Sequence, residues 1–231
     1  MTKSIAHRGD CYQHPENTLP AFHAAVASGA DMLETDIRIT RDGRAVLLHD
    51  RTLDRIWGHS KSISELTWDE ICRIRLESYQ IPLLEEVLDE ISLPFMLDFV
   101  DKNVPEILTA ILRRQSSLER FLVVTGDIPS LKRVKALLPE VKTGLTWNKR
   151  ELPTDELLTS LDVDFFNPEW KFLDSTILNH MHERGLRVSC WTVDDKEHMR
   201  SLLNLGVDAI TTNRLTTLVS LISKTKYSVK V

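Results

Sequence analysis

The sequence predicts an α/β protein folded as a TIM-type (β/α)8 barrel, and three observations support this class. Short apolar runs rich in β-branched residues alternate with amphipathic segments along the whole chain of 231 residues, as parallel strands alternate with helices. Setting aside one hairpin strand leaves eight strands, the number that a closed barrel needs. Gly29, Gly185 and Gly206 each follow a helical segment and precede an apolar strand, where glycine commonly ends helices.

The individual elements follow from the apolar patterns. The predicted strands are Lys3–His7, Met32–Ile39, Ala45–His49, Phe95–Val100, Phe121–Thr125, Lys142–Thr146, Asp164–Asn167, Arg187–Thr192 and Ala209–Thr212. The predicted helices are Leu19–Ser28, Pro82–Ile91, Val104–Gln115, Pro129–Leu138, Asp155–Leu161, Ser175–Arg184 and Lys196–Leu205. An open, doubly wound sheet is the alternative, but it would leave two edge strands to be explained. We therefore expect the barrel.

One short connection interrupts the alternation. Thr40-Arg41-Asp42-Gly43 is a tight turn, so Met32–Ile39 and Ala45–His49 should form a hairpin that extends the second barrel strand. With Asp42 near the turn, residues whose numbers sum to about 85 lie opposite one another, which pairs Asp36 with His49. A slip of one residue would change every pair of this register.

Residues 51–80 fit no strand–helix unit, and we interpret them as a short insertion on the barrel rim. Within the insertion, Ser64–Ile74 is predicted as a helix because its Ser-Glu-Leu-Thr opening suits a helix start. No internal repeat or low-complexity tract is present. Because the length suits one barrel, the sequence predicts a single domain over residues 1–231.

Composition limits the partners and the location. The formal net charge of −5 gives no reason to expect nucleic acid as a partner. The sequence has no apolar run of secretion-signal or membrane-span length. Cys11, Cys72 and Cys190 are odd in number and far apart, which is typical of free thiols in a reducing compartment. We expect a cytoplasmic protein without a membrane span; its oligomeric state is open, with a homodimer as one option.

Two acidic residues stand on an otherwise apolar strand. Glu34 and Asp36 are two positions apart, so their side chains point to the same face of Met32–Ile39. Two carboxylates on a buried face repel each other and lose hydration, and a divalent cation is the simplest compensation. Hard oxygen ligands suit magnesium or calcium, with manganese as a further option. The alternative is a pair of solvent-facing acids on an edge strand.

Histidines and an arginine are predicted to meet these acids. His7-Arg8-Gly9 closes the first strand, and the carboxyl ends of barrel strands form the active face. The planar guanidinium of Arg8 suits contact with a phosphate. The hairpin register brings His49 beside the same acids. A lone histidine at a strand end is more often structural, but neighbouring acids favour a functional role.

Later strands add three further candidates. Asp98 lies within the apolar run Phe95–Val100, and burial without a partner would be costly, so it needs a metal ion, an arginine or a lysine. Lys102 shares the face of Asp98 only if that strand continues. Trp191 ends a strand where an aromatic side chain can form an apolar wall, although tryptophans at such sites are usually part of the core.

Several motifs in fixed order resemble one family, the glycerophosphodiester phosphodiesterases, which belong to the phospholipase-C-like phosphodiesterase barrels. The resemblance runs nearly end to end. Its markers are Ala6-His7-Arg8-Gly9, Pro15-Glu16-Asn17-Thr18, Leu33-Glu34-Thr35-Asp36, Thr40-Arg41-Asp42-Gly43, Leu48-His49-Asp50, Thr52-Leu53-Asp54-Arg55, the segment from Ile81 to Leu88, Cys190-Trp191-Thr192-Val193 and the segment from Gly206 to Asn213. Several motifs in order are far more specific than any one of them.

The resemblance implies metal-dependent hydrolysis of a glycerophosphodiester to glycerol 3-phosphate and an alcohol. Carried over by position, it implies Glu34, Asp36 and Asp98 as ligands of one divalent cation. It implies His7 and His49 as the general acid–base pair, and we expect His7 as base and His49 as acid. Arg8 would hold a phosphate oxygen, while Lys102 and Trp191 are further candidates for substrate contact.

The chain departs from the family where Asp98 and Val100 stand in place of the usual Glu and Lys. Asp is one methylene shorter, so the ion must shift, gain a water or bind more weakly, and Lys102 is the candidate replacement for the cation. Two alternatives stay open. A lysophospholipase-D-like enzyme would show an apolar rim, for which the insertion offers Trp57, Ile63, Leu66, Trp68 and Tyr79, although these residues could equally pack the insertion onto the barrel. A non-catalytic phosphoester-binding barrel would have no need of both histidines.

Overall fold

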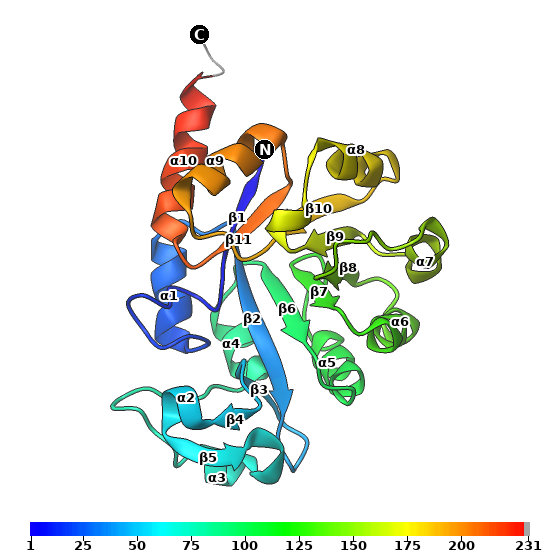
Figure 1. The fold of residues 1–231 in the computed structure, drawn as a ribbon. Coiled ribbons are helices and arrows are strands. Elements are labelled where there is room, and N and C mark those ends of the chain that lie inside the picture. The colour runs from blue at the N-terminus through cyan, green and yellow to red at the C-terminus, as the bar shows by residue number, and fades with distance from the viewer. Residues whose placement is uncertain (229–231) are drawn as a thin grey trace.

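Eight parallel strands close into a barrel in the computed structural model, which describes residues 1–228, with side chains to residue 224 (Figure 1). The barrel strands are β1 (Lys3–Ala6), β2 (Met32–Ile39), β6 (Phe95–Phe99), β7 (Phe121–Thr125), β8 (Lys142–Trp147), β9 (Phe165–Pro168), β10 (Arg187–Cys190) and β11 (Ala209–Thr212). Each strand pairs with the next in this order, and β1 pairs with both β11 and β2. Because the β1–β2 pairing closes the ring, the predicted barrel is confirmed and the open sheet is excluded.

Helices between the strands form the outer layer of the barrel (Figure 1). They are α1 (Leu19–Ala27), α4 (Leu84–Glu90), α5 (Val104–Leu112), α6 (Ile128–Leu137), α7 (Asp155–Leu161), α8 (Ser175–Glu183), α9 (Lys196–Leu205) and α10 (Leu215–Ser228). The seven predicted helices are present with ends shifted by at most a few residues. The last helix, α10, was not predicted, although Leu215, Leu218 and Leu221 bury one of its faces. None of the described helices is long and apolar enough to cross a bilayer.

The alternation of each strand separates two cores. Leu33 and Ile37 of β2 pack outward in the core between the strands and the helices. Ile5, Met96 and Phe165 belong to a cluster that fills the inside of the barrel. Since Glu34 and Asp36 alternate with Leu33 and Ile37, their side chains point to the inside of the barrel.

The hairpin of β2 and β3 (Ala45–Leu47) has a different register from the predicted one. Ile37 lies opposite Leu47 and Ile39 opposite Ala45, so opposing residue numbers sum to 84 (37 + 47). The predicted Asp36–His49 pair is therefore wrong by one residue. Asp36 lies opposite Leu48, and the backbone N–H of Leu48 donates to the backbone carbonyl of Asp36 at 3.0 Å. The Thr40 N–H donates to the Arg44 carbonyl at 2.9 Å, so the connection is a loop of three residues, 41–43, with Gly43 at φ +79.

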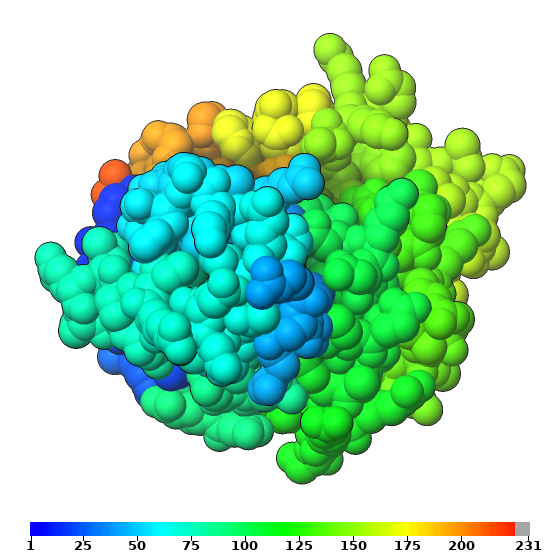
Figure 2. All heavy atoms as spheres, turned by 90° about the horizontal axis from the view of Figure 1, so that it is seen from below, coloured from blue at the N-terminus to red at the C-terminus, as the bar shows by residue number. Residues whose placement is uncertain are grey.

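The insertion forms a separate layer beside the hairpin. It contains β4 (Thr52–Leu53), α2 (Asp54–Trp57), β5 (His59–Ser62), a 3₁₀ turn η1 (Ile63–Glu65) and α3 (Trp68–Ile71), with β4 and β5 antiparallel. The predicted single helix Ser64–Ile74 is wrong because Leu66 is extended and Thr67 caps a new helix. Figure 2 shows the insertion as a cyan and teal lobe on one side of the molecule.

Candidate active site

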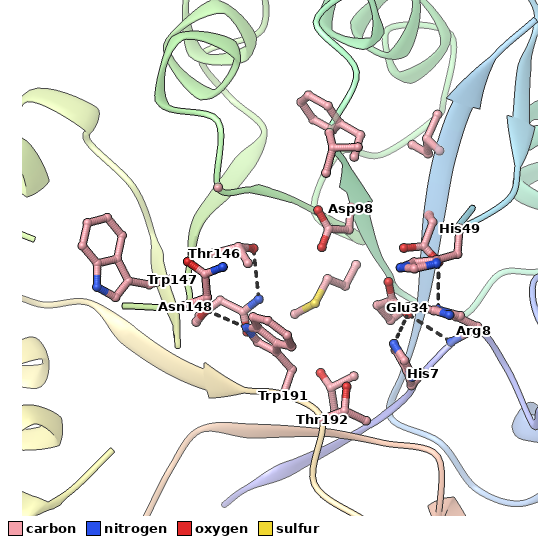
Figure 3. Close-up of a pocket in the computed structure, with 18 of the residues that line it drawn as sticks. His7, Arg8, Glu34, His49, Asp98, Thr146, Trp147, Asn148, Trp191 and Thr192 are labelled. Atoms are coloured by element: carbon pink, nitrogen blue, oxygen red, sulfur yellow. Dashed lines mark hydrogen bonds and ion pairs between the residues drawn. The ribbon is translucent and has the colours of Figure 1, made fainter. Parts of the chain in front are cut away.

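A cavity of about 500 Å³ opens at the carboxyl ends of the barrel strands, where a barrel of this type carries its active site. It is lined by seven of the eight side chains singled out from the sequence: His7, Arg8, Glu34, Asp36, His49, Asp98 and Trp191. Figure 3 shows His7, Arg8, Glu34 and His49 gathered on one side of the cavity, with Trp191 and Thr146 on another. The strands thus bring together residues that are up to 184 positions apart in the sequence (191 − 7).

Lys102 is the predicted residue that does not reach this cavity. β6 ends at Phe99, and Lys102 lies exposed in the turn before α5. The condition for Lys102 to share the face of Asp98, a continuing strand, is therefore not met. Arg38 and Lys149 are instead the cationic side chains that join Arg8 along the cavity wall.

The three candidate carboxylates lie on two neighbouring strands. Asp36 of β2 is the register partner of Asp98 of β6. Glu34 lies two residues before Asp36 on β2, so both side chains point to the same face of the strand. Burial, followed by the charge of Asp36, raises the pKa of Asp98 to about 8. The same two causes raise the pKa of Glu34 well above its usual range. The cavity wall therefore holds more negative charge than its immediate partners neutralise.

This donor set fits a hard divalent cation, because it consists of carboxylates whose ionised forms need a positive charge nearby. Asp36, Asp98 and Glu34 would hold that ion. In the part of the chain that the structure describes, no three acidic, histidine or cysteine side chains are gathered tightly enough to enclose a metal. Binding would therefore require the carboxylates to turn toward the ion or water to complete the shell.

Arg8 is fixed by acids on three sides. Its Nε lies 3.0 Å from Asp36 Oδ2 and its Nη1 2.9 Å from Glu16 Oε1. Its backbone N–H donates to Glu34 Oε2 at 3.0 Å. These anions raise the pKa of the guanidinium although burial acts against them. Arg8 has a positive φ of 58°, a backbone conformation that residues other than glycine rarely adopt. The contacts of Arg8 must stabilise this conformation.

His7 has a neutral hydrogen-bond partner. Its Nδ1 lies 2.7 Å from Asn213 Oδ1, and the amide of Asn213 is oriented because Nδ2 donates to Asp194 Oδ2 at 2.7 Å. Since Oδ1 can only accept, Nδ1 carries the proton and Nε2 keeps a free lone pair. Burial and the charge of Arg8 lower the pKa of His7, against the effect of Asn213 and nearby acids.

His49 has an acidic partner instead. Its Nδ1 lies 2.7 Å from Asp50 Oδ1, and its ring is more exposed than that of His7. The backbone carbonyl of His49 accepts from Nε of Arg38 at 3.1 Å, and Arg38 pairs in turn with Asp101 at 2.9 Å. The segment after β3 is thus anchored although no strand continues there.

Asn17 and Asn213 are site residues that sequence reasoning did not assign. Asn17 does not cap α1, whose N-cap is Thr18. The buried Asn17 amide instead donates to Asp36 Oδ2 at 2.9 Å and accepts from the Thr35 hydroxyl at 2.7 Å. Both asparagines stand in motifs quoted for the resemblance, which was the only signal in the sequence for their positions.

The wall that contains Trp191 is held by main-chain and amide contacts. Trp191 Nε1 donates to the carbonyl of Asn167 at 3.0 Å, and the Asn167 amide donates to Thr146 Oγ1 at 3.2 Å (Figure 3). Ser189 donates to Asn167 Oδ1 at 2.8 Å. The indole is therefore fixed in the cavity wall, where Trp191 stays a candidate for substrate contact.

Comparison with known proteins shows the family to which the chain belongs. Residues 7–217 match the sequence model of the glycerophosphoryl diester phosphodiesterase family. The chain belongs to this family. Its members are phosphodiester hydrolases, so the chain is an enzyme of that class, and the cavity is its candidate active site.

Individual relatives agree with this assignment. A glycerophosphodiester phosphodiesterase of Caldanaerobacter subterraneus subsp. tengcongensis is 29% identical, covering 96% of this chain and 98% of the relative. A lysophospholipase D of Homo sapiens is 27% identical, over 92% of this chain and 83% of that one. The structure of an Oleispira antarctica phosphodiesterase in complex with sn-glycerol-3-phosphate matches with a TM-score of 0.89 at 24% identity, covering 96% of this chain and 97% of that one.

Proposed function

We propose that this phosphodiesterase hydrolyses glycerophosphodiesters to glycerol 3-phosphate and an alcohol, with one divalent cation and a pair of histidines. The single observation that carries the proposal is the meeting of His7, His49, Arg8 and the carboxylates of Glu34, Asp36 and Asp98 in one cavity. The names printed for the family and for the Caldanaerobacter relative support the substrate class.

The hydrogen-bond partners of the histidines suggest their roles. Asn213 is neutral and holds the proton on Nδ1 of His7, so the lone pair on Nε2 can accept a proton. His49 instead donates from Nδ1 to a carboxylate oxygen of Asp50, so its ring is oriented by an anion and Nε2 is left to face the leaving oxygen. We therefore assign His7 as the general base and His49 as the general acid.

In the proposed reaction, His7 Nε2 takes a proton from the nucleophile, either a hydroxyl of the glycerol or a water molecule. The nucleophilic oxygen forms a bond to phosphorus while the bond from phosphorus to the alcohol oxygen breaks. Attack by water gives glycerol 3-phosphate directly, whereas attack by the glycerol hydroxyl gives a cyclic phosphate, which a water molecule then opens with the two histidines in exchanged roles. His49 gives its Nε2 proton to that leaving oxygen. Arg8, fixed by Glu16 and Asp36, stabilises the negative charge on the phosphate oxygens.

A cation held by Glu34, Asp36 and Asp98 would neutralise charge on the phosphate and hold one of its oxygens in place. Mg²⁺ and Ca²⁺ suit carboxylate ligands best, and Mn²⁺ binds the same ligand type. Asp98 is shorter than the Glu expected at this position, which favours a ligand shell that includes water.

The lysophospholipid alternative finds less support. Trp57, Ile63 and Leu66 of the insertion are only 5%, 2% and 4% exposed, and they form the insertion's own core with Val46 and Leu48. Trp68 and Tyr79 are partly buried against the same core, so most of the predicted apolar rim is used in packing the insertion.

We also propose that the protein is located in the cytoplasm. Cys11, Cys72 and Cys190 are free thiols, which is typical of proteins in a reducing compartment.

Purified protein tests the proposal directly. With Mg²⁺, Mn²⁺ or Ca²⁺ it should release glycerol 3-phosphate from glycerophosphoethanolamine or glycerophosphocholine, and chelator, His7→Ala or His49→Ala should abolish release. Undiminished turnover in chelator would exclude the metal mechanism. Cleavage of lysophosphatidylcholine without any glycerophosphodiester turnover would favour the lipid alternative. Binding without turnover of any diester would favour a non-catalytic barrel.

A further inference from the structure

Arg55 lies in the insertion but makes its polar contacts with the active-site loops. It belongs to α2, and its guanidinium reaches two acids outside that helix. Nε lies 2.5 Å from Asp50 Oδ2, while Nη1 and Nη2 lie 3.0 and 2.7 Å from the two carboxylate oxygens of Glu16. All three nitrogens of the guanidinium are therefore used, and the contact with Glu16 is bidentate.

The same two acids also contact Arg8 and His49. Glu16 Oε1 also accepts from Arg8 Nη1 at 2.9 Å. The second oxygen of Asp50 lies 2.7 Å from Nδ1 of His49. Polar contacts thus run in a continuous chain from Arg8 through Glu16, Arg55 and Asp50 to His49. The chain joins the loop after β1 to the segment after β3.

We propose that Arg55 is a positioning residue, which fixes His49 and Arg8 relative to each other through Asp50 and Glu16. This inference rests on the proposed function, in which His49 protonates the leaving oxygen and Arg8 binds the phosphate. It gives the insertion a part in the reaction, although no residue of the insertion lines the cavity in the part of the chain that the structure describes.

The need for such a residue follows from the position of His49. β3 ends at Leu47, so the His49 ring has no strand pairing to orient it, and its side chain is 45% exposed. Asp50 alone could move together with the ring. Its second oxygen is held by Arg55, which is held in turn by the largely buried Glu16. A single exposed ion pair contributes little, but a bidentate network with a buried member restricts all its parts.

Attachment of the insertion does not require Arg55. The insertion shares an apolar core with Val46 and Leu48. A second arginine, Arg41 of the hairpin, donates to the Glu65 carbonyl at 2.9 Å and pairs with Glu70 at 3.2 Å. Arg41 therefore binds the same insertion without touching Asp50 or Glu16, which makes it the matched control.

The test compares two glycerol 3-phosphate esters with different leaving groups. The ethanolamine ester needs a proton on its leaving oxygen, whereas p-nitrophenolate leaves as an anion. The ratio of kcat for the p-nitrophenyl ester to kcat for the ethanolamine ester reports the action of His49, because any change in phosphate binding by Arg8 cancels. We expect Arg55→Ala to raise this ratio by about 10-fold or more.

Variants of the two acids separate the two ends of the chain. Asp50→Asn should raise the ratio as Arg55→Ala does, and the double variant should raise it no further than the larger single effect. Glu16→Gln should raise KM for both esters because Arg8 loses a charged partner, and it should raise the ratio less than Arg55→Ala does, because Arg55 keeps its contact with Asp50. Arg55→Lys should recover part of the loss, since one ammonium can reach only one of the two acids.

Two results would overturn the inference while leaving the proposed function intact. One is an unchanged ratio in both Arg55→Ala and Asp50→Asn while wild-type protein hydrolyses both esters. The other is an equal rise of the ratio in Arg41→Ala, which would reduce Arg55 to an attachment of the insertion. If wild-type protein hydrolyses neither ester, the proposed function itself fails and this inference fails with it.

Discussion

Asp36 and Asp98 lie directly opposite each other on the neighbouring parallel strands β2 and β6, and both carboxylates line the same cavity. Glu34 adds a third acid on the same face. Burial and the charge of Asp36 raise the pKa of Asp98 to about 8, so near neutral pH this carboxylate is protonated when no cation is bound. The pair is thus a cost to the fold that a bound cation would offset.

A first prediction concerns the stability of metal-free protein. The folded pKa of Asp98, about 8, lies above the unfolded value of about 3.9. Between these values the folded state binds more protons than the unfolded state, so the free energy of unfolding falls as pH rises from about 4 to about 8. Asp98→Asn removes this cost and should stabilise metal-free protein above pH 8 by on the order of a few kcal/mol.

Urea unfolding in chelator at pH 5, 7 and 9 measures this effect. The difference between wild type and Asp98→Asn should grow with pH over that series, since only the wild type has a carboxylate to ionise. Parallel curves for the two proteins would contradict the buried, proton-binding carboxylate. Glu151→Gln, a change on an exposed loop residue, is the control and should leave the pH dependence as in wild type.

The alternation of side chains along a strand and the order of the motifs predicted the central residues of the candidate site. Alternation along the strand placed Glu34 and Asp36 on one face, and the family resemblance added Asp98, which the barrel brings opposite Asp36. The hairpin register was wrong by one residue because a loop of three residues closed by Gly43 and a loop of two residues are hard to tell apart from the sequence. His49 reaches the cavity nevertheless, because it lies beyond the paired part of β3.

Contacts between loops could not be predicted in the same way. The prediction that Lys102 shares the face of Asp98 was not met because β6 ends at Phe99. The turn into α5 decides where the strand ends, and the sequence of the strand itself carries no signal for it. Asn213 and Arg55 are joined to His7 and His49 by side-chain geometry at the barrel mouth, which neither periodicity nor composition encodes. α10 does have buried leucines at helical spacing, so its omission was a missed pattern.

Asp98→Glu is the substitution that tests the ligand assignment. The longer side chain restores the reach of the residue usual in the family, so we expect tighter binding of Mg²⁺ or Ca²⁺, by about 10-fold. Calorimetric titration of the metal into chelator-treated protein measures the change. Unchanged affinity would remove Asp98 from the ligand set. Asp101→Glu, on the cavity-distal side of Arg38, is the matched control.

Asn213→Ala should impair catalysis through His7 alone. The change removes the acceptor that holds the proton on Nδ1, so the ring is free to adopt the other tautomer and to rotate. We expect kcat to fall by about 10- to 100-fold with a small change in KM. Steady-state kinetics with glycerophosphoethanolamine measure both constants. A rise in KM at unchanged kcat would instead assign Asn213 to substrate binding.

Gly9→Ala should disturb both the fold and the site, because Gly9 has φ +81 and its added Cβ would lie 2.7 Å from the backbone carbon of Ala21. Gly185→Ala is the matched control, with φ +77 and open space around it. The backbone strain alone should cost about 1 kcal/mol at Gly185, and the clash should make the cost at Gly9 at least about twice as large. Chemical denaturation measures both values, and the kinetics of Gly9→Ala should show a raised KM because Arg8 is displaced. Equal costs at the two positions would show that α1 yields to the added methyl group and that close packing of this loop is not required.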